Sequence, residues 1–86
     1  MAGTVLVRVP EDLWPSRRDW RGRVAALHVQ AGDMVSRGQV VAEVEIEKAI
    51  LEVESPVSGR VVMVYAGVGD EVGPGDPLIE VEAVEG

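Results

Sequence analysis

Hydrophobic and polar residues alternate along several short stretches of this 86-residue chain. The clearest stretches are residues 40–46, VVAEVEI, and residues 49–54, AILEVE, in which every second residue belongs to a wholly apolar face. A period of two residues is typical of β-strands that bury one face, and no segment shows the 3.6-residue period of an amphipathic helix. Turn signals such as Gly-Asp and Pro-Gly-Asp-Pro separate the stretches. The pattern therefore predicts an all-β fold, a sandwich or barrel of short strands.

The chain also contains an internal repeat, which relates residues 22–45 to residues 59–82 at an offset of 37 positions. Ten of the 24 aligned positions are identical, and they include turn glycines as well as the opening Gly-Arg-Val and the closing Glu-Val-Glu. A match caused by valine-rich composition alone would not explain the aligned turn residues. We therefore expect residues 1–86 to form a single domain of two similar halves with pseudo-two-fold symmetry.

Residues 40–46 and 49–54 are separated by only Glu47 and Lys48, which indicates a tight β-hairpin. A two-residue loop usually needs Asn-Gly or Gly. Neither residue here favours positive φ, so we expect a less usual turn held by its flanking strands. One register places both apolar faces inward, as a hairpin requires, and it makes these pairs: Ile46 with Ala49, Val44 with Leu51 and Ala42 with Val53 inward, Glu45 with Ile50 and Glu43 with Glu52 outward.

Lys48, at the tip of this hairpin, is the only lysine of the chain, which has seven arginines. A lysine amine can be acylated to a stable amide, whereas a guanidinium is a poor substitute. The alternative is an ordinary surface lysine, which its uniqueness disfavours. The tip is surrounded by acidic residues, which form either a recognition surface or a solvated face that keeps the sheet edges soluble; they are Glu43, Glu45, Glu47, Glu52 and Glu54.

Composition and charge exclude several classes of protein. The 15 acidic and 8 basic residues give a net charge of −7, which disfavours binding to nucleic acid or to an anionic membrane. With no cysteine and one histidine, a structural metal site of the zinc type is not expected. The longest apolar run, residues 61–66, is too short to span a bilayer, and the N-terminus lacks a signal-peptide pattern. We therefore expect a cytoplasmic protein.

These features together resemble the lipoyl/biotinyl carrier domains. Glu47-Lys48-Ala49 resembles the Asp-Lys-Ala signature of lipoyl domains at the tip of the central hairpin, with Glu47 and Ala49 as its recognition flanks. Gly32 lies sixteen residues before Lys48 and Gly59 eleven after it, which are typical distances of the family. The segment from Ser55 to Gly59, SPVSG, is similar to its Ser/Ala-Pro-x-x-Gly turn. The resemblance implies a flattened β-barrel, or barrel-sandwich hybrid, of two short antiparallel sheets.

The resemblance also implies a function, that of a carrier and not of a catalyst. Lipoate joined to Lys48 would be a swinging arm that shuttles acyl or aminomethyl groups and reducing equivalents between enzymes. The implied partners are a lipoate ligase or a lipoyl transferase/synthase, and then decarboxylase, acyltransferase and dihydrolipoyl dehydrogenase components. The relatives would be 2-oxo acid dehydrogenase acyltransferases, of which this chain could be a piece, or glycine-cleavage H-protein. Which acyl group is carried is not indicated.

Two alternatives remain at this point. Biotin domains resemble this sequence but carry Met-Lys-Met at the tip, so biotin on Lys48, for carboxyl transfer, is the second candidate. The other is an unmodified β-barrel that only binds partners. Nothing indicates catalysis within the chain: His28 is expected in a partly buried strand, Asp33 and Asp70 in turns, and Met34 and Met63 in the core.

Residues 11–21 interrupt the repeat with an extra loop that holds both tryptophans and three arginines. In lipoyl domains of the acyltransferase kind the corresponding loop is shorter and lies beside the modified lysine. The loop either caps an open end of the barrel, with Trp20 as the cap, or recognises a partner. For partner recognition we select Trp14, Arg17 and Arg18, because Trp and Arg are frequent at binding hot spots, together with Glu45 beside the tip.

Overall fold

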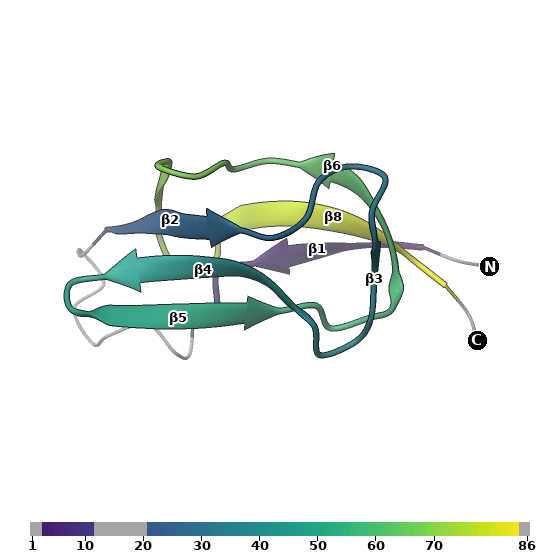
Figure 1. Ribbon diagram of the computed structural model, residues 1–86, viewed down its shortest axis with the longest axis horizontal. Coiled ribbons are helices and arrows are strands. Elements are labelled where there is room, and N and C mark those ends of the chain that lie inside the picture. The colour runs from purple at the N-terminus through teal and green to yellow at the C-terminus, as the bar shows by residue number, and fades with distance from the viewer. Residues whose placement is uncertain (1–2, 12–20, 85–86) are drawn as a thin grey trace.

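The structure is a computed structural model that describes residues 3–11 and 21–84. These residues form eight strands and no helix (Figure 1). The strands are β1 (Thr4–Arg8), β2 (Gly22–Leu27), β3 (Met34–Val35), β4 (Val40–Ile46), β5 (Ala49–Glu54), β6 (Gly59–Val64), β7 (Glu71–Val72) and β8 (Pro77–Ala83).

The strands form two antiparallel four-stranded sheets. One has the order β5-β4-β2-β7 and is called the hairpin sheet here; the other has the order β1-β8-β6-β3 and is called the terminal sheet. The two sheets enclose one core in which valine predominates, since valine packs well on a pleated surface. The predicted all-β barrel-sandwich of two short sheets is therefore confirmed. Its buried apolar residues are Val7, Val9, Val24, Val29, Val35, Val41, Ala42, Val44, Ile46, Val53, Val61, Ala66, Val72, Leu78, Ile79 and Val81.

The two sheets repeat one another at the offset of 37 residues seen in the sequence. β2 corresponds to β6, β3 to β7 and β4 to β8, and β5 occupies the place that β1 has in the other sheet. The turn glycines Gly32 and Gly69 have φ values of 98° and 93°, which only glycine adopts readily. The carboxylates of Asp33 and Asp70 accept hydrogen bonds from the backbone N–H three residues earlier, at 3.0 and 2.8 Å. The expectation that both aspartates stabilise turns is thus confirmed.

The β4–β5 hairpin has the register that the sequence predicts, with Ile46 opposite Ala49. Two expectations about it were wrong. First, the turn was expected to contain no residue with a positive φ, but Glu47 has a φ of 55°. A positive φ at the first central residue alone is typical of a type II′ turn. Ala49 was expected to point into the core but is exposed, although its partner Ile46 is buried.

Three other expected burials were also wrong. Met34 and Met63, expected in the core, are 64% and 48% exposed. Met63 lies next to a bulge in β6, where the register against β8 shifts and the inward alternation is interrupted. His28 lies just after β2 and is exposed, and its Nε2 is 2.7 Å from Oε2 of Glu43.

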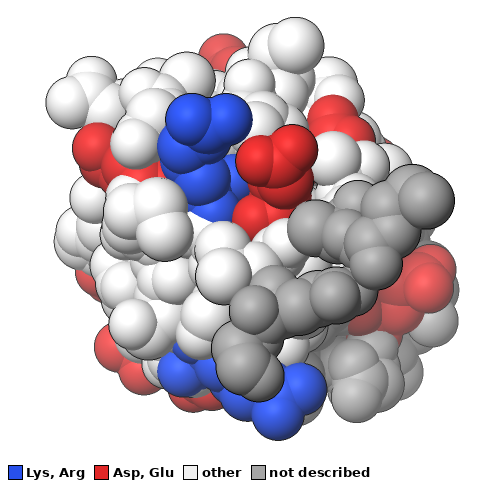
Figure 2. Space-filling view, turned by 90° about the vertical axis from the view of Figure 1, so that its right-hand side faces the viewer, with Lys and Arg blue, Asp and Glu red and all other residues white. Residues whose placement is uncertain are grey.

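The molecule is elongated along the strands, with principal extents of 39, 22 and 17 Å. The β4–β5 turn lies at one end and both termini lie at the other (Figure 1). Figure 2 views the terminal end, where the described surface is mostly uncharged and a basic side chain lies directly beside an acidic one. The hairpin tip is therefore remote from the chain ends.

Gly59, which the family resemblance singles out, lies where β6 approaches β8 closely. A Cβ at this position would overlap the backbone carbonyl oxygen of Glu82. We expect Gly59→Ala to lower the free energy of unfolding by about 3 kcal/mol, because backbone must move to admit the methyl group. Gly67→Ala is the control, since its Cβ would meet no atom closer than 4.0 Å. Thermal denaturation of both variants measures the difference, and equal melting temperatures would contradict this account.

Tyr65 and Glu80 form a surface pair that makes stability depend on pH. The Tyr65 hydroxyl donates to Oε1 of Glu80 at 2.7 Å. This bond, followed by one from Thr4, lowers the pKa of Glu80, and it raises the pKa of Tyr65 above 10.0. A lowered carboxyl pKa stabilises the fold above the unfolded pKa, and that contribution disappears as pH falls through the folded pKa. The raised pKa of Tyr65 stabilises the fold below pH 10.0, and this contribution is lost as pH rises through the pKa of Tyr65 in the folded protein.

We expect Tyr65→Phe to raise the pKa of Glu80 towards its ordinary value, because the largest cause of the depression is removed. Titration of the Glu80 carboxyl carbon by NMR, in wild type and variant, measures this change. The same Glu80 titration in both proteins would contradict the assignment.

Candidate functional site at the hairpin tip

Lys48 lies in the two-residue turn between β4 and β5, at the far end of the hairpin sheet. Its side chain is exposed, and no described residue forms a hydrogen bond or ion pair with it. The turn itself is held in place, because both flanking strands are paired along their length and Val44 and Ile46 are fully buried. The result is a free primary amine on a rigid support.

The residues predicted to flank the site lie where the sequence places them. Glu47 and Ala49 are the immediate neighbours of Lys48, and both are exposed. Glu45 points outward from β4 and lies opposite Ile50 of β5. The other residues selected for partner recognition, Trp14, Arg17 and Arg18, lie outside the described residues, as does Trp20.

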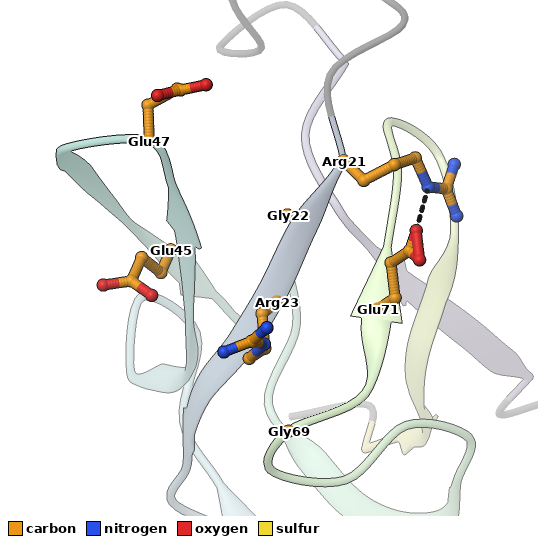
Figure 3. Close-up of a pocket in the computed structure, with 7 residues that line it drawn as sticks. All are labelled: Arg21, Gly22, Arg23, Glu45, Glu47, Gly69 and Glu71. Atoms are coloured by element: carbon orange, nitrogen blue, oxygen red, sulfur yellow. Dashed lines mark hydrogen bonds and ion pairs between the residues drawn. The ribbon is translucent and has the colours of Figure 1, made fainter.

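A pocket of about 320 Å³ lies below the tip, on the outer face of the hairpin sheet. Figure 3 shows Glu45 and Glu47 on the hairpin at one side of the pocket, Arg21 and Glu71 at the other, and Arg23 on β2 between them. Glycines complete the lining, so the floor is backbone. The lining residues are Arg21, Gly22, Arg23, Glu45, Glu47, Gly69 and Glu71.

Arg21 is fixed at the rim of this pocket by three contacts. Its Nε donates to Oε1 of Glu71 at 3.2 Å, and its Nη2 lies 3.6 Å from Oδ2 of Asp76. Its guanidinium lies against Gly73, where any Cβ would overlap Nη1. Arg21 therefore connects the end of the 11–21 segment to β7 and to the turn that follows it.

The sequence did not identify three residues that the structure adds to the site: Arg21, Arg23 and Glu71. Arg23 could be seen in the repeat, where it aligns with Arg60, but its position beside Glu45 depends on the pairing of β2 with β4. Such pairing between distant segments leaves no local signal. Within residues 3–11 and 21–84, no group of three potential metal ligands and no helix able to cross a membrane occurs.

The fold and the exposed tip lysine define a class of protein, the barrel-sandwich carrier domain, and comparisons with known proteins agree. Residues 18–81 match the biotin/lipoyl family, described as "Biotin-requiring enzyme". A solved structure, a single-chain, multi-domain long-chain acyl-CoA carboxylase, superimposes with a TM-score of 0.77 and covers 98% of this chain and 7% of its own. Its identity is 23%, so it supports the fold alone.

Three relatives extend this result. The lipoamide acyltransferase component of the branched-chain alpha-keto acid dehydrogenase complex of Pseudomonas aeruginosa is 46% identical over 59 residues, 69% of this chain and 14% of that protein. The dihydrolipoyllysine-residue acetyltransferase component of the pyruvate dehydrogenase complex of the same organism is 42% identical over 66 residues, which are 77% of this chain and 12% of that protein. The mitochondrial propionyl-CoA carboxylase alpha chain of Rattus norvegicus is 37% identical over 79 residues, which are 91% of this chain and 11% of that protein.

The chain therefore belongs to the biotin/lipoyl attachment-domain family, whose members carry covalently attached lipoate or biotin. It spans between 11% and 14% of the length of these relatives.

The carboxylates below the tip include a directly opposed pair, Glu43 and Glu52. Like charges in this position repel, so we expect Glu52→Gln to raise the free energy of unfolding by about 0.5 kcal/mol at low salt, and by less at high salt. Glu54→Gln is the matched control on the same face, because Glu54 lies opposite Val40. Chemical denaturation at two salt concentrations measures both variants. Destabilisation by Glu52→Gln would show that this carboxylate has a favourable partner.

Proposed function

We propose that this chain is a lipoyl carrier domain and that Lys48 is its attachment site. The observation that carries the proposal is the exposed, unpaired amine of Lys48 in the β4–β5 turn, in a family whose members carry a covalently attached group. Attachment joins a carboxylic acid, activated with ATP, to Nζ of Lys48. The C–N bond forms as the C–O bond to AMP breaks, and the proton lost by the amine goes to solvent.

The flanks of Lys48 support lipoate over biotin. Glu47 and Ala49 are similar to the Asp-Lys-Ala signature of lipoyl domains and differ from the Met-Lys-Met of biotin domains. Two relatives with lipoyl names share 46% and 42% identity with the chain. Biotin on the same lysine is the second candidate, because the carboxylase relative matches 91% of the chain at 37% identity.

The described residues fit a group that is carried and not enclosed. Lys48 would hold lipoate through an amide bond, and a bound lipoate supplies a dithiolane that accepts an acyl or aminomethyl group and electrons. The part played by this chain is presentation, because the paired strands keep the amine at a constant position. Tethering raises the local concentration of the carried group at each partner. The chain has no cysteine, so no protein thiol is present to exchange with the carried disulfide.

The partners that we propose follow from the relatives, which are named as components of 2-oxo acid dehydrogenase complexes. A decarboxylase would load the arm, an acyltransferase would unload it, and dihydrolipoyl dehydrogenase would reoxidise it. The chain itself would contribute recognition and not catalysis.

We expect the intact mass of the protein, expressed with a lipoate ligase and lipoate, to increase by one lipoyl group, located on Lys48 by fragmentation. Lys48→Arg should abolish the increase, because a guanidinium is not acylated. A mass increase of one biotinyl group on Lys48 would instead identify the chain as a biotin carrier. An unmodified chain in cells that contain both groups would overturn the carrier function.

A relocated lysine provides the control for position. The double variant Lys48→Arg/Arg37→Lys moves the single lysine to another exposed turn, between β3 and β4. We expect it to remain unmodified. Modification at position 37 would show that any exposed amine suffices and that the hairpin tip has no special role.

A further inference from the structure

The outer face of the hairpin sheet carries a row of three neighbouring side chains just below Lys48. Ile50 of β5 lies opposite Glu45 of β4, which lies opposite Arg23 of β2. We call these residues the tip row. All three are exposed, and Ile50 is 49% exposed although it is apolar. Glu45 and Arg23 also line the pocket below the tip.

The repeat provides an internal comparison for this row. At the offset of 37 residues, Glu45 corresponds to Glu82 and Arg23 to Arg60, and Thr4 of β1 has the place of Ile50. In the terminal sheet, Nη2 of Arg60 lies 3.6 Å from Oε1 of Glu82, so this pair satisfies itself. No such contact joins Arg23 to Glu45 among the described residues, although they are direct neighbours in the register. The half that carries Lys48 thus leaves both charges free and adds an exposed isoleucine.

Of the enzymes that act at Lys48, the one that attaches the group makes the strictest demand on this surface. Enzymes served by a long arm can act on its far end without touching the hairpin. The attaching enzyme has only the bare amine, so its active site must come within bonding distance of Nζ. The first outward-facing row below the turn must then lie at the mouth of its cleft. Arginine is enriched at protein interfaces, and the exposed Ile50 in the same row offers apolar area that a partner can cover.

We propose that the tip row is the docking surface for the ATP-dependent enzyme that acylates Lys48, and that Arg23 is a specificity-determining residue that pairs with a carboxylate of that enzyme. Glu45 would pair with a cation beside it, and Ile50 would be covered by apolar surface. This inference rests on the proposed function, because it requires Lys48 to be an attachment site. Free charges of opposite sign, fixed on neighbouring strands, orient a partner and speed its association.

The test measures attachment kinetics with purified lipoate–protein ligase and biotin–protein ligase, ATP and the two acids. The substrates are the unmodified chain, Arg23→Gln and the matched control Arg60→Gln, which has the same change in charge at the equivalent position of the other sheet. We expect Arg23→Gln to raise KM roughly tenfold at low salt and to leave kcat unchanged, since docking is impaired and chemistry is not. The effect should shrink in about 0.5 M salt, where the Debye length is a few ångströms.

Arg60→Gln should remain within about twofold of wild type, as expected for a charge remote from the docked surface. Ile50→Thr, which copies the residue of the other half, should raise KM at both salt concentrations, because apolar contact is not screened.

Several results would overturn the proposal. Equal KM values for Arg23→Gln and Arg60→Gln, while wild type is modified, would remove the docking role and leave the carrier function intact. A lower kcat at unchanged KM for Arg23→Gln would show that Arg23 affects the geometry of the Lys48 turn and not the association with the ligase. Normal attachment combined with slower acyl loading would assign the row to the loading enzyme. No modification of wild type by either ligase would overturn the proposed function together with this inference.

Discussion

The register of β4 on β5 is the constraint on which the rest of the structure depends. It is set by burial: Val44, Ile46 and Val53 are at most 2% exposed, and they face the core only in this pairing. A shift by one residue would turn them outward and bring carboxylates into the core, where they lose their hydration. The same shift would move Lys48 out of the turn. The position of the Lys48 amine is therefore determined by the buried side chains of the two flanking strands, Val44, Ile46 and Val53.

Burial also explains why the outer face can be strongly charged, since the apolar inner face supplies the stability. Two of the four edge strands, β5 and β1, occupy equivalent places in the two sheets and differ in how they use this freedom. Outward residues of β5 include Glu52 and Glu54, while the equivalent places of β1 hold Leu6 and Arg8. Charged side chains are one of several means of protecting a sheet edge, and β1 has only Arg8 of this kind. The acidic edge is thus specific to the half that carries Lys48.

Much of the fold could be predicted because its determinants are local or repeated. The alternation in residues 40–46 and 49–54 is sufficient to predict both strands, their register and the lysine at the tip. The errors arise where local signals are absent. The positive φ of Glu47 is imposed by the paired strands, and the exposure of Met63 follows from a bulge that alternation does not reveal. The pocket could not be predicted because Arg23 and Glu45 meet only through the pairing of β2 with β4.

The pseudo-symmetry of the fold is broken at the hairpin turn that holds Lys48. β8 and β1 pair in the terminal sheet as β4 and β5 do in the hairpin sheet, but no turn joins them, because β1 is the first described strand and β8 is the last. The fold therefore has a hairpin turn between β4 and β5 and no turn at the equivalent place between β8 and β1. The β4–β5 turn places Lys48 at one end of the long axis of the molecule, whose extent is 39 Å, and the outer ends of β1 and β8 lie at the other (Figure 1). The turn that holds Lys48 and the outer ends of β1 and β8 thus lie at opposite ends of the same core.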